Sequence, residues 1–244
     1  MKRVIALGAS NLTRGLRTVV SMSRVAWGRD TEVIAALGLG RSYGAHSRVI
    51  VRRLPGILES GLWRTVDALP PAPTIGIVSD VGNDILYGYA PQQILTWVGD
   101  AVTRLQRYTG DIALTGLPFH NVADLSERRF RIMRTVMFPS SRQTLAGARA
   151  TSVVVQGGLE RLAARRGVRF IPLRREWYAW DPVHFHSSSW RNVWAEFLGL
   201  DQSSLANEPG GLTESVRLWL RADEHRWLFG IHQHTPQKGP IQLY

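Results

Sequence analysis

The chain has 244 residues, of which 44% are hydrophobic and 20% are charged, and its formal net charge is +11. This length and composition suit a globular protein with one sizeable core or two small ones. The absence of cysteine excludes a disulfide framework, a thiolate metal site and a cysteine nucleophile. No apolar run approaches the ~18 residues of a membrane span. The basic start precedes only a short apolar stretch, Val4 to Leu7, so we predict no signal peptide and a cytoplasmic protein.

Arginine dominates the positive charge, because only Lys2 and Lys238 among the 30 basic residues are lysine. A basic face can bind nucleic acid or steer an anionic substrate. Arginines spread over solvated helix faces would give the same composition. The sequence shows no zinc finger, helix-turn-helix or aromatic RNA-binding pattern, so nucleic-acid binding is the less favoured interpretation.

Short apolar runs alternate with amphipathic stretches through the first 200 residues. The predicted strands are 3–7, 32–37, 74–78, 112–117 and 168–171. The predicted helices are 12–27, 57–69, 91–108, 145–166 and 187–198. Five strand–helix repeats predict an α/β fold in which crossover helices cover both faces of a parallel sheet.

The last 44 residues break this alternation. Apolar and polar residues alternate over 216–221, and a turn at 222–225 followed by a strand from Trp227 would form a β-hairpin. We therefore predict a main domain over 1–200 and a C-terminal extension over 201–244, which is packed on the domain or appended to it.

Four polar or glycine-rich loops follow the predicted strands, at the edge where α/β sheets hold their sites. They are Gly8-Ala9-Ser10-Asn11, Gly38-Leu39-Gly40-Arg41-Ser42, Ser79-Asp80-Val81-Gly82-Asn83-Asp84 and Asp181-Pro182-Val183-His184.

These loops carry the residue types that acyl transfer needs. A serine hydroxyl such as that of Ser10 becomes a nucleophile when a base takes its proton, and His184 is a suitable base. Asp181, three residues earlier, can orient the imidazole and stabilise its protonated form. The backbone N–H groups of Ser10 and Gly40 and the amide of Asn83 are candidate donors to an oxyanion.

The same blocks resemble those of the SGNH hydrolases, the GDSL-type esterases and lipases. Ser10 in "GAS", Gly40 in "GLGRS", Asn83 in "GND" and the pair in "DPVH" match them in order. The resemblance implies a flavodoxin-like three-layer α/β/α sandwich, here with a five-stranded sheet, and a serine ester hydrolase without a cofactor. It implies that Ser10 is the nucleophile, that Gly40 and Asn83 complete the oxyanion hole, and that His184 and Asp181 complete the triad.

Two blocks depart from the family pattern. Ala9 stands where the family has aspartate, which bears on the geometry of the first loop rather than on the triad. The last block continues as "FHSSSW" where many relatives have Pro-Asn and a glycine, which affects the following helix start and the acyl pocket.

Each residue taken alone also has a structural interpretation. Ser10 or Asn11 could cap a helix, Gly40 could close a turn, and the Asn83-Asp84 pair is typical of a turn or cap. His184 with His186 suggests a metal pair, but no third ligand is evident. We expect no metal site, and a surface role for His232 and His234.

Arg41 and Asp84 are the candidate substrate-binding residues. Arg41 directly follows the proposed oxyanion glycine, so we expect it to face or rim the cleft and to pair with an anionic part of a substrate. The alternative is that Arg41 bonds local carbonyls while Arg48, Arg52 and Arg53 decorate a solvated helix.

The sequence thus favours a serine ester hydrolase that acts on a small-molecule ester, with anionic and carbohydrate-linked esters among the options. Two alternatives remain: a catalytically inactive SGNH-like binding protein, and a basic nucleic-acid-associated protein.

Overall fold

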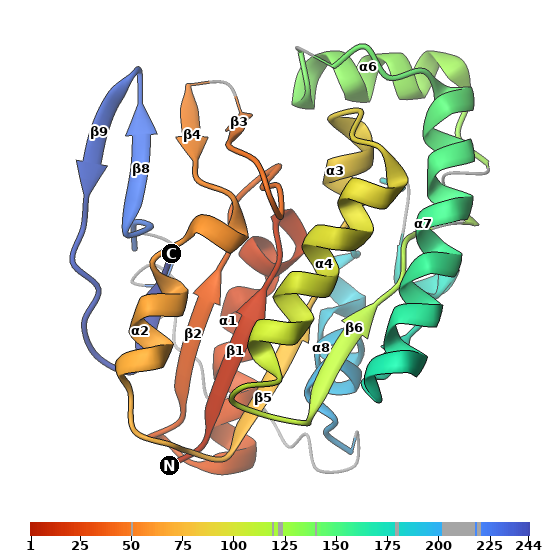
Figure 1. The fold of residues 1–244 in the computed structure, drawn as a ribbon. Coiled ribbons are helices and arrows are strands. Elements are labelled where there is room, and N and C mark those ends of the chain that lie inside the picture. Colours follow the sequence, from red (N-terminus) through yellow and green to blue (C-terminus); the bar gives the residue numbers. More distant parts are fainter. Residues whose placement is uncertain are drawn as a thin grey trace.

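The structure is a computed structural model that describes residues 1–49, 51–118, 120–121, 124–139, 141–178, 181–201, 218 and 221–244. All five predicted strands are present in one parallel sheet, and a sixth joins them (Figure 1). The strands are β1 (Arg3–Leu7), β2 (Glu32–Ala36), β5 (Thr74–Val78), β6 (Ile112–Thr115), β7 (Arg169–Ile171) and β10 (Ile241–Leu243).

The order of the strands confirms the flavodoxin-like prediction. The sheet runs β10-β2-β1-β5-β6-β7, and every pairing in it is parallel. Without β10, and with the remaining strands numbered from 1 along the chain, this is the 2-1-3-4-5 order of flavodoxin-like folds. In that order the sheet grows to one side of β1 with β2 and to the other side from β5 onward, so the order of the strands reverses between β1 and β5 while all strands stay parallel. The predicted number of five strands is too low by one, because the C-terminal segment supplies β10 beside β2.

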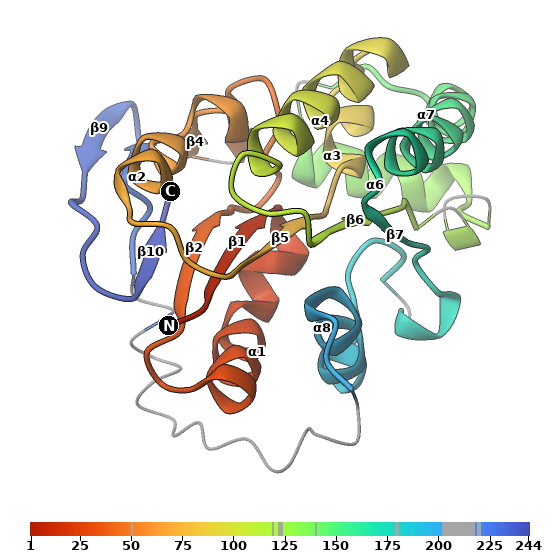
Figure 2. The same cartoon turned by 60° about the horizontal axis from the view of Figure 1, so that its bottom comes forward.

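Alternation along β1 divides the core into two layers. Val4 and Ala6 pack into a cluster with the helices of 10–27 (α1) and 190–198 (α8). Ile5 and Leu7 pack on the other side with the helices of 62–68 (α2), 91–105 (α4) and 145–166 (α7). All five β1 residues are buried, as expected of a parallel strand covered on both faces. Figure 2 shows α1 and α8 below the sheet and α2, α4 and α7 above it.

Helix boundaries follow local signals where these are strong. Helix α7 is followed by Gly167, which adopts a left-handed conformation with φ of 63°. Glycine ends the helix in this conformation without the steric clash that a Cβ atom would cause. The helices are α1 (Ser10–Trp27), α2 (Leu62–Ala68), α3 (Gly82–Leu86), α4 (Pro91–Leu105), α6 (Glu127–Met137), α7 (Leu145–Arg166) and α8 (Trp190–Leu198). Within the described residues, no helix has the length and apolar character needed to cross a membrane.

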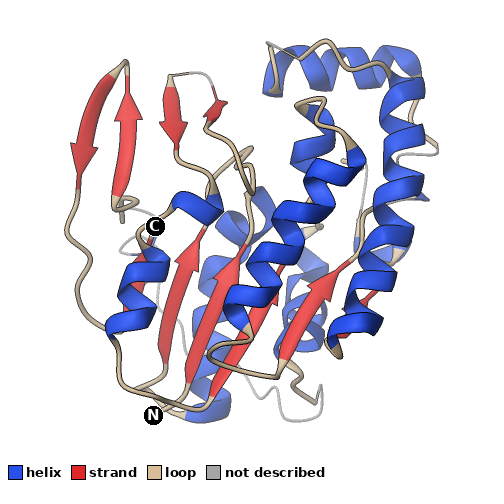
Figure 3. Cartoon of the chain, viewed as in Figure 1, coloured by secondary structure: helices blue, strands red, loops and turns tan. Residues whose placement is uncertain are grey.

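A second, antiparallel sheet stands beside the main one (Figure 3). It has the order β3-β4-β8-β9, with strands β3 (Ser47–Val49), β4 (Arg52–Leu54), β8 (His225–Leu228) and β9 (Ile231–His234). Arg48, Arg52 and Arg53 therefore lie on strands, and their predicted placement on a helix is wrong.

A C-terminal hairpin is present, but it is not the predicted one, because its arms are β8 and β9. The two arms meet at Phe229 and Gly230, both with positive φ, rather than at 222–225. The predicted first arm, 216–221, lies mostly outside the described residues. Because β8 pairs with β4 and β10 pairs with β2, the C-terminal segment completes two sheets at once.

Candidate active site

The site lies at the reversal point of the main sheet, where β1 and β5 diverge. The loop after β1 leads into α1 on one face, and the loop after β5 leads into α3 on the other. In open α/β sheets such a reversal opens a crevice beyond the carboxyl ends of the strands. Ser10 lies here as the first residue of α1, so it follows the helix cap rather than forming it.

Asp80 supplies the negative charge at the start of α1. Its carboxylate accepts hydrogen bonds from the backbone N–H groups of Ala9 at 2.7 Å and Leu12 at 3.2 Å. Asp80 has a φ of 61°, a left-handed conformation that aspartate tolerates better than most residues. A carboxylate is favourable at a helix N-terminus. The first loop has Ala9 where the family pattern has aspartate, so the carboxylate at this helix start comes from the loop after β5 instead.

Asn11 ties the histidine loop to the serine helix. Its side-chain oxygen accepts from the N–H of Phe185 at 2.8 Å, and its amide donates to the carbonyl of Val183 at 3.0 Å. The same amide donates to Asp80 at 2.8 Å. Asn11 therefore holds the residues before and after His184, while being the residue directly after Ser10.

His184 and Asp181 form a close pair within one turn. His184 Nδ1 lies 2.6 Å from Asp181 Oδ2, and Asp181 Oδ1 accepts from the N–H groups of Val183 at 3.0 Å and His184 at 3.3 Å. Partial burial would raise the pKa of Asp181, but the bonds from His184 and Val183 outweigh it and lower the pKa to about 2. The carboxylate is thus ionised across the neutral range, as the orienting partner of a histidine base must be.

The other ring nitrogen of His184 makes no hydrogen bond with the described residues. Nε2 is buried and has no hydrogen-bond partner among the described residues, and His184 as a whole is 5% exposed. Ser10, also 5% exposed, is not hydrogen-bonded to it in this structure. Catalytic hydrogen bonds often form only once substrate is bound.

Asn83 is hydrogen-bonded to the loop that carries Gly40. Asn83 Nδ2 donates to the carbonyl of Arg41 at 3.3 Å, and the hydroxyl of Tyr87 donates to the carbonyl of Gly40 at 2.8 Å. Gly40 has a φ of 64°, and a Cβ there would lie 2.6 Å from Val49. Only glycine suits this close, left-handed turn. Asn83 retains a second N–H and lines the same cavity as Ser10.

Arg41 does not face the cleft, so that prediction is wrong. Its side chain is 0% exposed and donates to the carbonyls of Leu37, Pro55 and Tyr244. Burial lowers its pKa to about 10, which leaves it charged at neutral pH. The alternative interpretation, that Arg41 bonds local carbonyls, describes what the structure shows.

Asp84 is likewise structural rather than substrate-binding. It is 0% exposed, and its carboxylate accepts from the hydroxyl of Ser42 and from the N–H of Tyr43 at 3.0 Å. Burial raises the pKa of Asp84 to about 6 despite these two hydrogen bonds. Asp84 fastens the loop after β2 to α3 and thereby fixes the position of Gly40.

An apolar cavity extends from Ser10 and Asn83 under α6. Helix α6, which the sequence analysis missed, directs Phe130, Met133 and Met137 into it. The remaining lining is also mainly apolar: Val81, Ile85, Leu86, Leu117, Pro118, Leu125, Ala148, Leu173 and Val183, with Asn11, Asp80, Gly82, Gly116, Ser152 and Tyr178.

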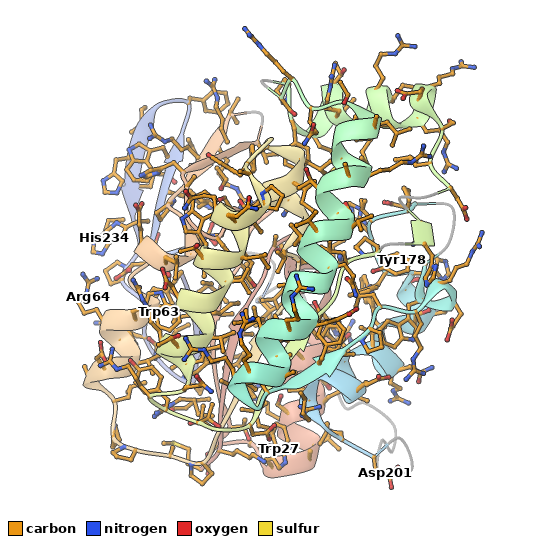
Figure 4. The ribbon with its side chains drawn as sticks, turned by 45° about the vertical axis from the view of Figure 1, so that its right-hand side comes forward. Trp27, Trp63, Arg64, Tyr178, Asp201 and His234 are labelled. Atoms are coloured by element: carbon orange, nitrogen blue, oxygen red, sulfur yellow. The ribbon has the colours of Figure 1, made fainter. Side chains whose placement is uncertain are left out.

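Tyr178, labelled in Figure 4, contributes a buried hydroxyl to this cavity. The hydroxyl has no hydrogen-bond partner among the described residues. Burial and the nearby charges of Asp80 and Asp181 raise its pKa well above its ordinary value. Tyr178 therefore keeps its proton and offers a hydrogen-bond donor at the cavity wall.

Comparison with known proteins identifies the fold. No protein-family model matches the chain, and no curated protein matches it. A carbohydrate acetylesterase family member from Sinorhizobium meliloti has a TM-score of 0.53 at 18% identity, covering 82% of this chain and 100% of that one. A lipolytic protein of the G-D-S-L family from Veillonella parvula has a TM-score of 0.52 at 13% identity, covering 82% and 97%.

A GDSL-like lipase from Bacteroides thetaiotaomicron has a TM-score of 0.51 at 12% identity, covering 83% of this chain and 87% of that one. At these identities the likeness concerns the fold. The chain has the fold of the SGNH hydrolases, as the four sequence blocks predicted.

Proposed function

We propose that this protein is a serine ester hydrolase of the SGNH type. One observation carries the proposal: the His184 imidazole is bonded through Nδ1 to Asp181, while Nε2 is buried and free of described partners. Asn11 clamps both neighbours of this histidine and is itself adjacent to Ser10. A base, its orienting carboxylate and a serine at a helix start are therefore held by one set of bonds.

In the proposed reaction, Ser10 Oγ attacks the ester carbonyl carbon while His184 Nε2 takes the hydroxyl proton. The backbone N–H groups of Ser10 and Gly40 and the amide of Asn83 stabilise the oxyanion. His184 returns the proton to the departing alcohol, leaving an acyl-enzyme. Water, deprotonated by His184, then releases the carboxylic acid and regenerates Ser10.

The cavity under α6 supports an ester with an apolar acyl group as the substrate class. Its lining is aliphatic, aromatic and thioether side chains beyond the polar end at Ser10 and Asn83. Burying each methylene of an acyl chain there contributes about 0.8 kcal/mol. Short aliphatic esters longer than acetate should therefore react with a higher kcat/KM than acetate esters.

The test is hydrolysis of a p-nitrophenyl ester series, from acetate to octanoate, by wild type and Ser10→Ala. Loss of Ser10 should lower kcat by at least about 10³-fold, because the triad acts as a unit. Ser187→Ala is the matched control, since Ser187 is an exposed serine beside the histidine loop and should retain wild-type rates. Circular dichroism verifies that each variant is folded.

Covalent labelling gives a second readout that does not depend on choosing the right ester. A fluorophosphonate probe should attach to Ser10 in wild type and leave Ser10→Ala unlabelled, as peptide mass spectrometry would show. A folded Ser10→Ala protein with most of the wild-type activity would contradict the nucleophile assignment. A wild-type protein that binds esters but neither hydrolyses them nor reacts with the probe would be a binding protein instead.

A further inference from the structure

The β8–β9 hairpin gathers three imidazoles on one face. His225 and His234 are directly paired across the two strands, and His232 precedes His234 by two residues. Since side chains alternate between the faces of a strand, all three project to the same side. This "HQH" segment with its cross-strand partner lies in the second sheet and plays no part in the proposed ester hydrolysis.

The three rings are closely stacked. The centroids of His225 and His234 are 4.7 Å apart at an interplanar angle of 17°, and those of His225 and His232 are 5.2 Å apart at 14°. Nδ1 of His225 lies 3.1 Å from Nε2 of His232, so one ring donates to the other. With Nδ1–H of His225 as the donor, its Nε2 lone pair is free for another partner.

Glu224 lies at the root of this hairpin and is only 8% exposed. Its Oε1 accepts from Arg64 on α2 at 3.0 Å. Its Oε2 is buried, has no hydrogen-bond partner among the described residues, and lies 3.8 Å from His225 Nε2. It packs so closely against Gly61 that a Cβ there would lie 1.7 Å away. Arg64 thus satisfies only Oε1, and a buried carboxylate oxygen without a donor is costly unless a cation or a donor binds it.

We propose that Glu224, His225 and His234 bind a divalent transition-metal ion of the zinc class. Their candidate ligand atoms all lie within 4.8 Å of one another. Zinc bonds of about 2.0–2.2 Å place neighbouring tetrahedral ligands about 3.3–3.6 Å apart. The ligand atoms would therefore have to move closer together, chiefly by rotation of the exposed His234 side chain. Two imidazoles and one carboxylate suit zinc, whereas calcium and magnesium favour oxygen-only sites.

The surroundings are those of a supported metal site. Ligating histidines usually donate their second ring N–H to a fixed acceptor, which His232 supplies to His225. Arg64 orients the carboxylate by holding Oε1, and leaves Oε2 to the metal. His234 and Arg64 lie on the same side of the molecule (Figure 4).

Binding there would fasten the hairpin to the main domain. Glu224 contacts the start of α2, and β8 pairs with β4 while β10 follows the hairpin into the main sheet. The metal would stabilise this junction, at a place separate from Ser10 and His184. The proposed metal site therefore does not depend on the proposed hydrolase activity.

The experiment is calorimetric titration of metal-free, tag-free protein with ZnCl2, with MgCl2 as a second titrant. Wild type should bind one zinc ion and show no comparable magnesium binding. His234→Gln and His225→Gln should each weaken zinc binding at least tenfold, since even the loss of an outer-shell partner costs about 10–100-fold. His186→Gln, which removes an exposed imidazole elsewhere, should bind zinc like wild type.

Two further readouts distinguish a built site from weak surface binding. Zinc should raise the Tm of wild type and of His186→Gln but not that of His234→Gln, whose exposed side chain can be replaced without loss of folding. Co²⁺ should give the intense visible absorption of a tetrahedral complex. The proposal is overturned if His234→Gln and His225→Gln bind zinc as tightly as wild type, or if Co²⁺ shows only the weak bands of a hydrated ion.

Discussion

The two loops that flank Ser10 use their polar residues differently. In the loop of 181–185, the Asp181 carboxylate and the His184 imidazole bond to each other, and Nε2 remains available. In the segment of 38–45, the buried Arg41 guanidinium donates through Nε and Nη1 to three backbone carbonyls. One loop therefore leaves an imidazole nitrogen unbonded, whereas the other uses a buried arginine to fix the backbone around Gly40.

The same contrast occurs between two adjacent residues of α3. Asn83 lines the cavity, whereas Asp84 turns inward and holds Ser42 and Tyr43. In this short helix, one side chain is therefore open to a ligand, whereas the next is committed to the fold. Substitutions at the two positions should affect different measurements, which makes the comparison testable.

Asn83→Ala should have the largest effect on catalysis among the residues outside the triad. Removing one oxyanion donor typically lowers kcat by about 10²–10³-fold, and KM should change less because the contact strengthens in the transition state. Steady-state kinetics on the best p-nitrophenyl ester would measure both constants. A variant altered only in KM would show instead that Asn83 binds the ground-state ester.

Asn11→Ala should have the next largest effect, through the position of His184. Without its side chain, the carbonyl of Val183 and the N–H of Phe185 lose their links to the serine helix. A displacement of the base of about 1 Å can lower the rate about 10²-fold. We expect kcat to fall and the fluorophosphonate labelling rate to fall with it.

Asn11→Asp provides the matched control for this prediction. Its carboxylate keeps an acceptor for Phe185 but loses the donor to Val183 and repels Asp80, so its rate should not exceed that of wild type. If Asn11→Ala hydrolyses the ester and reacts with the fluorophosphonate probe at wild-type rates, the hydrogen bonds of Asn11 have no role in positioning His184.

The sequence predicted the features that depend on neighbouring residues. Continuous apolar runs marked all five predicted strands, and the turn residues after them marked the four loops. The bonds by which Asp80 and Asn11 join the loops were not predicted, because they link residues 68 to 174 positions apart. One signal was available: Ala9 in the first block leaves the start of α1 without a local carboxylate, and Asp80 lies in the adjacent loop.

Arg41 and the small sheet could not be placed from the sequence for the same physical reason. Burial of an arginine requires acceptors, and those of Arg41 come from Leu37, Pro55 and Tyr244. Strands β3 and β4 have three residues each, too few for a periodic pattern. They exist because β8, more than 170 residues away, pairs with β4.

Asp84→Asn should lower kcat much less than Asn83→Ala, because asparagine can still accept a hydrogen bond in the same place, and should mainly alter how stability depends on pH. Burial raises the pKa of Asp84 from 3.8 to about 6, so between these values the folded protein binds more protons than the unfolded chain. The stabilisation from protonated Asp84 is therefore complete below about pH 4 and is lost as pH rises through 6. A shift of about two units corresponds to a loss on the order of 3 kcal/mol.

Urea unfolding of wild type and Asp84→Asn at intervals from pH 4 to pH 8 would isolate this effect. Other groups titrate alike in both proteins, so the difference between their free energies of unfolding reports Asp84 alone. Asparagine also accepts less strongly from Ser42 and Tyr43, which shifts the whole difference by a constant and leaves its slope intact. Wild type should lose stability relative to the variant between pH 4 and pH 7, with the steepest change near pH 5, midway between the two pKa values. Parallel curves would mean that Asp84 stays ionised in the folded protein, and that its hydrogen bonds from Ser42 and Tyr43 outweigh its burial.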